Sequence, residues 1–401
     1  MWLSALAALM VAAVGCTGSV KATNVDPDRG DGGAGDGRRP SNDARANDAG
    51  ANGDVAIADA GTATDLGARA SDASTGGSAP EVGAPDGGVP PPSPPSDGGA
   101  PVATDARSEP VALNALQVAG THNSYHVAPL VAFHASHKYT HRPLDEQLAG
   151  GLRALELDVH LRNDGVFDVY HIAVIDQRAT CETFEACLRT VANWSGANPR
   201  HTPIFIWIEI KDDTGGSPID DPQKLEETIL RVFPREKLIT PDSLRGSHAS
   251  PRERIMKTGW PRVDDVRGKI MFSVLNRDER ARVYTRDYTS LNDRLMFVSA
   301  TAEQYEMPWA AVTEAYVDDP SLMAKAHASR LLTTSNVCAI DRSDDDCRQR
   351  LATALAAGVH MLKDDLPFTA NGRGYTLTLP KGSPGCNPVT APPSCLTTQL
   401  E

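Results

Sequence analysis

The first quarter of this 401-residue sequence lacks aromatic side chains altogether. Between Thr17 and Pro110 there is no Phe, Trp or Tyr, although 17 of the chain's 33 Gly and 11 of its 29 Pro fall in this segment. So few apolar side chains cannot offset the entropy that a backbone loses when it becomes ordered. We therefore expect residues 17–110 to form a disordered tether, and residues 111–401 to fold as one domain with a large core.

The sequence also lacks an apolar run long enough to span a bilayer at its start. The apolar opening from Trp2 to Val14 is too short for that purpose. It ends in Ala13-Val14-Gly15-Cys16, and small residues of this kind are typical of a cleavage point. We interpret residues 1–16 as a signal peptide that resembles a bacterial lipobox, in which Cys16 is lipidated and anchors the protein to a membrane surface of the cell envelope. Plain secretion is the alternative.

Acidic residues outnumber basic ones in both parts of the chain. The formal net charge is −13, of which −8 falls in residues 17–110 and −5 in the rest. Neither part has a basic stripe that would neutralise phosphate chains, so we do not expect nucleic acid as a partner. An acidic protein that acts on an anionic phosphodiester would need a bound metal ion or a few well-placed Lys and Arg side chains.

Cysteine is rare and its positions are paired. Apart from Cys16, six Cys form three pairs that are close in sequence: Cys181 with Cys187, Cys338 with Cys347, and Cys386 with Cys395. A zinc site would have CxxC spacing or interleaved His. We therefore predict three local disulfides formed in an oxidising compartment, the last of them in the C-terminal segment.

The folded part alternates short β-type runs with helical patterns, which is typical of parallel βα units. The expected strands are Leu116–Gly120, Ala154–His160, Pro203–Lys211, Ile270–Leu275, Leu295–Ala300, Leu331–Thr334 and Val359–Lys363. The expected helices include Leu144–Gly150, Thr183–Asn193, Pro222–Val232 and Cys347–Ala357. Seven or eight strands in about 290 residues favour an α/β fold of the (β/α)8 TIM-barrel type, distorted where a helix is missing.

One strand separates two kinds of side chain by alternation. In Pro203–Lys211, four Ile occupy the even positions, while Phe205, Trp207, Glu209 and Lys211 occupy the odd positions. Successive side chains of a strand point to opposite faces. We expect the Ile face to pack under helices and the other face to line the barrel, with Glu209 and Lys211 at its C-terminal mouth. An edge strand with solvated charges is the alternative, which the four Ile disfavour.

Two further strands place ionisable and amide side chains at the same end of the barrel. Glu156 and Asp158 share one face of a strand, and two such carboxylates should not be buried without a cation. A hairpin signal follows at Asp164-Gly165, and a two-residue loop would set His171 directly opposite Asp158, whereas a three-residue loop would shift the register by one. With His122 and Asn123 after the first strand, these residues predict a hard-cation site beside two proton-transfer groups.

These residues resemble the phosphatidylinositol-specific phospholipase C superfamily, and specifically its calcium-dependent bacterial branch. The motifs that carry the resemblance are Gly120-Thr-His-Asn-Ser-Tyr125, Leu155-Glu-Leu-Asp158, Tyr170-His171 and Ile208-Glu-Ile-Lys211, together with the segments 140–148, 181–203 and 364–367. The resemblance covers about Leu113 to Phe368 and its motifs are specific in order and spacing.

The resemblance implies a phosphodiesterase that needs Ca²⁺ and forms a cyclic inositol phosphate. The implied calcium ligands are Asn123, Glu156, Asp158 and Glu209. His122 would stabilise charge on the phosphate and His171 would protonate the leaving glycerol oxygen, while Glu156 would also deprotonate the attacking hydroxyl. Lys211 and Asp365 match substrate-binding positions, and Lys211 would meet the phosphate. The implied partner is a phospholipid or a soluble phosphodiester, and we expect a monomer.

At one point the sequence departs from the pattern expected for this family, and alternative functions therefore remain. The run Leu331–Asn336 presents Thr, Ser and Asn where an Arg would be expected to face an anionic substrate. The alternatives are a glycerophosphodiester phosphodiesterase or another phosphodiesterase on the same barrel, and an inactive surface-anchored binding module. Against the glycerophosphodiesterase, Thr-His-Asn follows Gly120 in place of that family's His-Arg-Gly. We expect His134, His137 and His141 on the surface and Asp344–Asp346 in a solvated loop.

Overall fold

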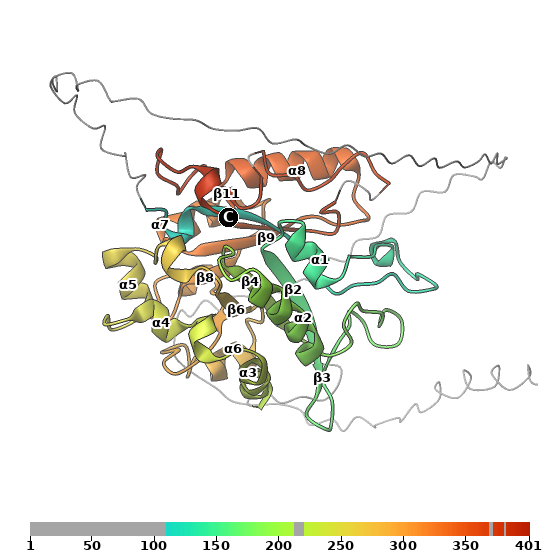
Figure 1. Ribbon diagram of the computed structural model, residues 1–401, viewed down its shortest axis with the longest axis horizontal. Coiled ribbons are helices and arrows are strands. Elements are labelled where there is room, and N and C mark those ends of the chain that lie inside the picture. The colour runs from blue at the N-terminus through green and yellow to red at the C-terminus, as the bar shows by residue number, and fades with distance from the viewer. Residues whose placement is uncertain (1–109, 212–219, 369–371, 381) are drawn as a thin grey trace, which may run out of the picture. The chain divides into compact units, whose positions relative to one another are not determined.

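The computed structural model describes residues 110–211, 220–368, 372–380 and 382–401 (Figure 1). The predicted signal peptide with Cys16, and the predicted tether up to residue 109, lie outside the described residues. Among the helices of the described ranges, none combines the length and the apolar character that crossing a bilayer requires.

Eight parallel strands pair side by side in a ring. In spatial order they are β1 (Leu116–Thr121), β2 (Ala154–Leu161), β4 (Ile204–Ile210), β6 (Ile270–Val274), β7 (Phe297–Val298), β8 (Val312–Glu314), β9 (Leu332–Cys338) and β10 (Met361–Asp364). β10 pairs with β1, whereas β7 and β8 share only the isolated bridge Ser299–Val312. The predicted α/β class with a curled parallel sheet is therefore confirmed, and the curl is incomplete at β7 and β8.

Helices cover the outside of this sheet (Figure 1). They are α1 (Leu144–Ala149), α2 (Phe184–Ala197), α3 (Asp220–Val232), α4 (Pro241–Arg245), α5 (Pro251–Thr258), α6 (Glu279–Tyr284), α7 (Pro320–Ala328) and α8 (Asp344–Ala356). Only a 3-10 turn, Ala302–Gln304, lies between β7 and β8, so a helix of the regular barrel is missing there. Asp344–Asp346 form the first turn of α8 after the N-cap Ser343, so the solvated-loop prediction is wrong: carboxylates near a helix N-terminus are favourable.

All seven expected strands are present in the ring, and β8 is the ring strand that the sequence pattern missed. β8 has three residues, too few for alternation to be recognised. Two short strands lie beside the ring, β3 (Phe167–Val169) and β5 (Leu238–Ile239). β3 pairs with β2 so that Val159 faces Val169, and the connecting loop is therefore the three residues 163–165. Of the two registers that the sequence left open, the structure has the one with the three-residue loop, so His171 lies beyond the end of β3 and not directly opposite Asp158.

The two faces of β4 pack as predicted. Its Ile residues belong to an outer apolar layer with Phe184 of α2 and Leu225 of α3. Phe205 and Trp207 belong to an inner layer with residues of the other strands, which fills the barrel. Burying each such side chain contributes about 1.5–3 kcal/mol. This packing makes the strands a rigid frame for the residues at their C-terminal ends.

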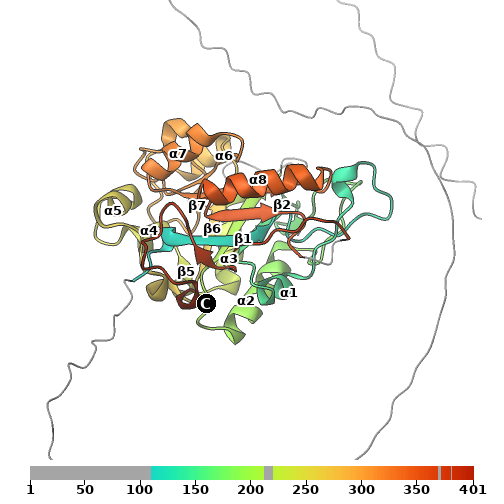
Figure 2. The same ribbon diagram turned by 90° about the horizontal axis from the view of Figure 1, so that it is seen from above.

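The C-terminal segment covers the opposite end of the barrel. Its strand β11 (Gly385–Cys386) pairs antiparallel with the start of β1, and the hydroxyl of Thr202, just before β4, donates to the carbonyl of Leu400. Figure 2 shows the C-terminus beside β1. The three predicted disulfides are all present: Cys181–Cys187, Cys338–Cys347 and Cys386–Cys395. Such bonds are typical of proteins in oxidising compartments outside the cytosol.

Candidate active site and metal centre

Polar side chains gather at the C-terminal mouth of the barrel. A cavity of about 310 Å³ opens there, and its lining residues lie in or directly after six strands. The lining residues are His122, Glu156, Glu209, Leu275, Asn276, Glu314, Tyr316 and Asn336. Gly120 permits the strands to meet this closely, because a Cβ at that position would lie 2.2 Å from the carbonyl oxygen of Ala154. Three of the residues predicted from sequence therefore line one cavity.

The three predicted acidic ligands converge. One carboxylate oxygen each from Glu156, Asp158 and Glu209 lies within 4.8 Å of the others. Ca²⁺–O distances of about 2.4 Å let one ion join oxygens up to about 4.8 Å apart. Both oxygens of Asp158 are buried without a hydrogen bond from any described residue, although the Lys211 ammonium lies 3.1 Å from Oδ2. The buried oxygens and the all-oxygen donor set fit a calcium ion.

Burial and like charge hold Asp158 in an unusual state. Burial raises its pKa to about 6; Lys211 opposes this shift, and Glu209 and Glu156 add to it. A carboxyl group in this position is neutralised by a proton or by a cation. A bound Ca²⁺ would take the role of the cation and keep Asp158 ionised.

Asn123 is fixed beside these carboxylates by its backbone and its neighbours. Its φ of 46° lies in the left-handed region, which Asn tolerates better than most residues. Tyr125 Oη donates to Asn123 Oδ1 at 3.3 Å, and Asn123 Nδ2 donates to Tyr139 Oη at 3.2 Å. Burial, followed by the charge of Asp158, raises the pKa of Tyr125 well above its usual value, so the phenol keeps its proton. The amide oxygen of Asn123 retains a second lone pair for a metal ion.

Two lysines neutralise the acidic cluster. Lys211 Nζ lies 2.8 Å from Glu209 Oε1, and the fully buried Lys363 forms an ion pair with Glu156 and lies 3.6 Å from Glu314 Oε1. Burial alone would raise the pKa of Glu156, but Lys363 and then His122 outweigh it and lower the pKa. Sequence reasoning missed Lys363, although it shares the inward face of its strand with Met361 by alternation.

His122 is held by Asp365, which directly follows the last strand, β10. Its Nδ1 lies 2.9 Å from Asp365 Oδ1, and its Nε2 lies 3.8 Å from Glu156 Oε1. Burial lowers the pKa of His122, but Glu156 and Asp365 outweigh burial and raise it to about 9. Asp365 Oδ2 accepts from the backbone N–H of Ile340. Both oxygens of Asp365 are therefore engaged by the protein, and this residue positions His122.

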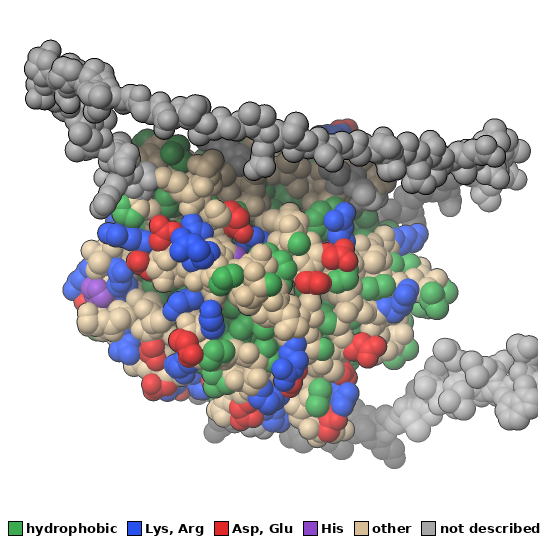
Figure 3. Space-filling model, in the orientation of Figure 1, with side chains coloured by type: hydrophobic (Ala, Val, Ile, Leu, Met, Phe, Trp, Pro, Cys, Tyr) green, Lys and Arg blue, Asp and Glu red, His purple; other side chains and the backbone are tan. Residues whose placement is uncertain are grey.

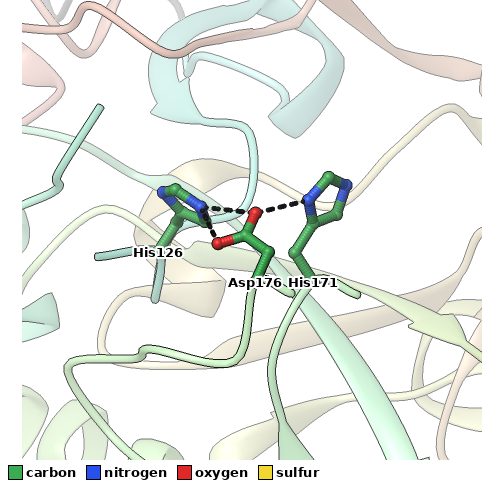
Figure 4. A group of neighbouring side chains, drawn as sticks. All are labelled: His126, His171 and Asp176. Carbon is green, nitrogen blue, oxygen red and sulfur yellow. Dashed lines mark hydrogen bonds and ion pairs between the residues drawn. The ribbon is translucent and has the colours of Figure 1, made fainter. Parts of the chain in front are cut away.

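His171 is held in the same way by a residue that the sequence did not reveal. Its Nδ1 lies 2.9 Å from Oδ2 of the buried Asp176, which also lies 2.9 Å from Nε2 of His126 (Figure 4). Burial opposes ionisation of Asp176, but its hydrogen bonds with His126 and His171 lower the pKa well below the usual value. Asp176 and His126 lie in loops, where no periodic pattern could have identified them.

The structure corrects the predictions made for two histidines. His134 is exposed as expected, but His137 and His141 are buried, so their surface prediction is wrong; His141 Nε2 donates to the carbonyl of His122. The arginine expected on β9 is absent from that strand. Arg277, which follows β6, donates to the carbonyl of Glu314 at 2.6 Å and to the hydroxyl of Ser299 at 2.9 Å, and it is not among the residues that line the cavity.

Comparison with known proteins gives one family. The family model described as "Phosphoinositide phospholipase C, Ca2+-dependent" matches residues 111–167 and 161–388, which is more than half of the chain. A search of curated proteins finds no match.

Solved structures give a weaker likeness. A calcium-dependent phosphoinositol-specific phospholipase C from a Pseudomonas species is 20% identical, with a TM-score of 0.49, over 67% of this chain and 95% of that chain. The Ca²⁺-dependent enzyme from Streptomyces antibioticus is also 20% identical, with a TM-score of 0.49, over 63% and 94%. The phosphatidylinositol-specific phospholipase C of Staphylococcus aureus is 13% identical, with a TM-score of 0.41, over 68% and 90%. Similarities at this level carry no functional argument.

Proposed function

Because this chain belongs to the family of Ca²⁺-dependent phosphoinositide phospholipases C, and is therefore a phosphoric diester hydrolase, we propose that it cleaves the glycerol–phosphate bond of phosphatidylinositol-type lipids by attack of the inositol 2-hydroxyl. The observation that carries the proposal is a pair of histidines, each with Nδ1 on a carboxylate, near the three acidic residues. His122 Nε2 lies 3.8 Å from Glu156 Oε1, and His171 is near enough to Asp158 for its charge to oppose the rise that burial causes in the pKa of that carboxyl group.

Asn123, Glu156, Asp158 and Glu209 would hold Ca²⁺. When bound, the ion would stabilise the negative charge that develops on the non-bridging phosphate oxygens. Lys211 now lies between Asp158 and Glu209. If both carboxylates bound Ca²⁺, the Lys211 ammonium would lose these ion pairs and would be free to contact the substrate phosphate. This agrees with the expectation that Lys211 binds the substrate.

His122 and Glu156 would act on the attacking side. Asp365 keeps the ring of His122 oriented and charged, and the imidazolium would stabilise the phosphate beside the metal site. Glu156 is ionised because of Lys363 and His122, and its Oε1 would accept the proton of the 2-hydroxyl. The nucleophile belongs to the substrate itself, so its high effective concentration favours a cyclic phosphate as the first product.

His171 would act on the leaving side. Asp176 fixes its Nδ1, and the ring keeps about 24% of its side-chain surface exposed, so Nε2 remains accessible to a substrate. A glycerol alkoxide is a poor leaving group and needs a proton, which the imidazolium of His171 would donate.

Exposed apolar side chains beside the site favour a lipid surface over a soluble diester. Leu130, Val131, Phe133 and Val174 are between 66% and 90% exposed. They lie on the loops before α1 and after β3, which are joined by a hydrogen bond from Val127 N to the carbonyl of Arg178. Figure 3 shows hydrophobic side chains at the edge of the molecule where Figure 1 places these loops. Insertion of these side chains into a membrane would bring the lipid headgroup to His171.

The test compares Ca²⁺ binding and turnover in one pair of variants. In Glu209→Gln, we expect Ca²⁺ to raise the melting temperature less than in the wild type and phosphatidylinositol cleavage to fall at least 10-fold. Glu182→Gln removes an exposed carboxylate outside the cluster and should behave as wild type. Equal Ca²⁺ responses in the two variants, or wild-type cleavage that persists in chelator, would contradict the proposal.

A further inference from the structure

A second cluster of ligand groups lies outside the carboxylate centre, on the loops that precede α1 and follow β3. One ligand atom each from His126, His171 and Asp176 lies within 4.8 Å of the others (Figure 4). The buried His137 adds a fourth group, because its Nδ1 lies 4.0 Å from Asp176 Oδ2. The ring of His137 meets that of His171 edge to face, with centroids 5.6 Å apart. Three imidazoles therefore surround one carboxylate.

The hydrogen bonds of His126 fix which of its nitrogens faces the cluster. Nδ1 lies 3.0 Å from the carbonyl oxygen of Tyr139, which can only accept, so Nδ1 carries a proton. Nε2 lies 2.9 Å from both oxygens of Asp176. Either a second proton or a shared cation must stand between Nε2 and the carboxylate. A histidine whose other nitrogen donates to a carbonyl is the usual arrangement of a metal ligand.

The second observation concerns a buried nitrogen atom of His137. It is only 4% exposed, and its Nδ1 has no hydrogen-bond partner among the described residues. Burial lowers the pKa of His137, which favours the neutral ring, whose unprotonated nitrogen carries a lone pair. A buried polar atom without a partner is destabilising. A metal ion between His137 and Asp176 would satisfy it.

We propose that His126, His137, His171 and Asp176 form a binding site for a transition-metal cation of the Zn²⁺ type, separate from the calcium centre. Three imidazole nitrogens and a carboxylate oxygen form a donor set that suits Zn²⁺, whereas Ca²⁺ prefers oxygen ligands alone. Tetrahedral coordination at about 2.0 Å places donor atoms about 3.3 Å apart. His137 Nδ1 would therefore approach Asp176 by about 0.7 Å, a movement available to a residue of the short 3-10 turn Ala135–His137.

The site has a consequence for catalysis, and this part rests on the proposed function. His171 would bind the cation through Nδ1, the nitrogen that now meets Asp176. An imidazole that has given its Nδ1 lone pair to a metal cannot also become an imidazolium, so it cannot serve as the general acid. Occupancy of the site would therefore stop turnover while Ca²⁺ remains bound at the carboxylates.

Calorimetric titration with Zn²⁺ tests the site itself. The full chain, free of any histidine tag and saturated with Ca²⁺, is expected to bind one Zn²⁺. His137→Asn should weaken this binding at least 10-fold, whereas His134→Asn, which changes the exposed neighbouring histidine, should not. His126→Asn is a second variant that removes a ligand. Co²⁺ should give a tetrahedral absorption spectrum in the wild type and in His134→Asn, but not in His126→Asn or His137→Asn. Absence of binding, or the same affinity in wild type, His126→Asn and His137→Asn, would overturn the site.

Measurements of phosphatidylinositol turnover distinguish the two parts of the proposal, the Zn²⁺ site and its inhibitory role. At a fixed Ca²⁺ concentration, Zn²⁺ should inhibit the wild type, and His137→Asn should need at least 10-fold more Zn²⁺ for the same inhibition. Zn²⁺ binding with undiminished turnover would overturn the inhibitory role and support the site. A chain that binds Zn²⁺ as described but never cleaves phosphatidylinositol would support the site and refute the proposed function.

Discussion

Nδ1 of His122 lies 2.9 Å from Oδ1 of Asp365, so the residues that directly follow the first and the last strand of the barrel form one ion pair at its mouth. Asp364, the neighbouring residue, accepts from Tyr375 instead, so only one of the two adjacent aspartates faces the ring. The pair gives His122 both its orientation and its charge.

Removal of the charge of Asp365 should disable His122 without disturbing the metal site. In Asp365→Asn, we expect kcat to fall about 100-fold or more, because a neutral amide orients the ring but no longer stabilises the imidazolium. Ca²⁺ affinity should stay within about threefold of the wild type. NMR titration should show that the pKa of His122, about 9 in the Ca²⁺-free wild type, is lower in the variant. An unchanged pKa would contradict this account.

The His122–Asp365 pair predicts how the free energy of unfolding depends on pH when a chelator has removed Ca²⁺. The folded pKa of His122 lies above its ordinary value of 6.5, so folding favours the protonated ring. The stabilisation from this group is fully present below about pH 6.5 and is lost as the pH rises through about 9. Urea unfolding of wild type and Asp365→Asn between pH 6 and 10 measures the difference. Two curves that stay parallel over this range would refute the linkage.

His171 should matter only when the leaving group needs a proton. His171→Ala is expected to lower kcat on phosphatidylinositol by about 10²–10⁴-fold. On an inositol phosphodiester of nitrophenol, whose nitrophenolate anion leaves without a proton, kcat of His171→Ala should fall much less. Equal losses on both substrates would mean that His171 does not act as the general acid.

Lys363 should hold the fold together when calcium is absent. Lys363→Met leaves Glu156 and Glu314 without this buried cation, and we expect it to lower the free energy of unfolding by about 3–5 kcal/mol in chelator. Ca²⁺ should restore part of the loss, because it would neutralise Glu156. Lys237→Met, at an exposed position, should change stability by no more than about 0.5 kcal/mol. Equal effects of the two variants would contradict the prediction.

The exposed apolar loops should act only at a lipid surface. Phe133→Ser with Val174→Ser is expected to lower turnover on phosphatidylinositol vesicles at least 10-fold, because burying each side chain in lipid contributes about 1.5–3 kcal/mol. Turnover of soluble glycerophosphoinositol should not change. Val389→Ser, another exposed apolar position on the C-terminal segment, is the matched control. Loss of turnover on the soluble substrate as well would indicate a structural defect.

The strand-borne part of the site could be predicted from sequence because alternation is local. The placing of Ile206 outside and Glu209 at the mouth follows from a two-residue period, and so does the pairing of Glu156 with Asp158 on one face. The same reasoning could have found Lys363, which alternates with Met361.

The loop-borne part could not be predicted in this way. The position of Asp176 between His126 and His171 depends on how two irregular loops cross, which no periodic pattern encodes. The hairpin after β2 shows the sensitivity of such reasoning, since one additional loop residue moved His171 away from a position opposite Asp158. The burial of His137 and His141 has the same cause, because a polar stretch of sequence turned inward around the site.

Phosphorus NMR of the protein with phosphatidylinositol vesicles tests the central assignment most directly. With Ca²⁺, the account predicts that a cyclic inositol phosphate appears first, that chelator abolishes it, and that Glu209→Gln does not form it. A product released without the cyclic phosphate, or the same cyclic product at an undiminished rate in chelator, would contradict the account.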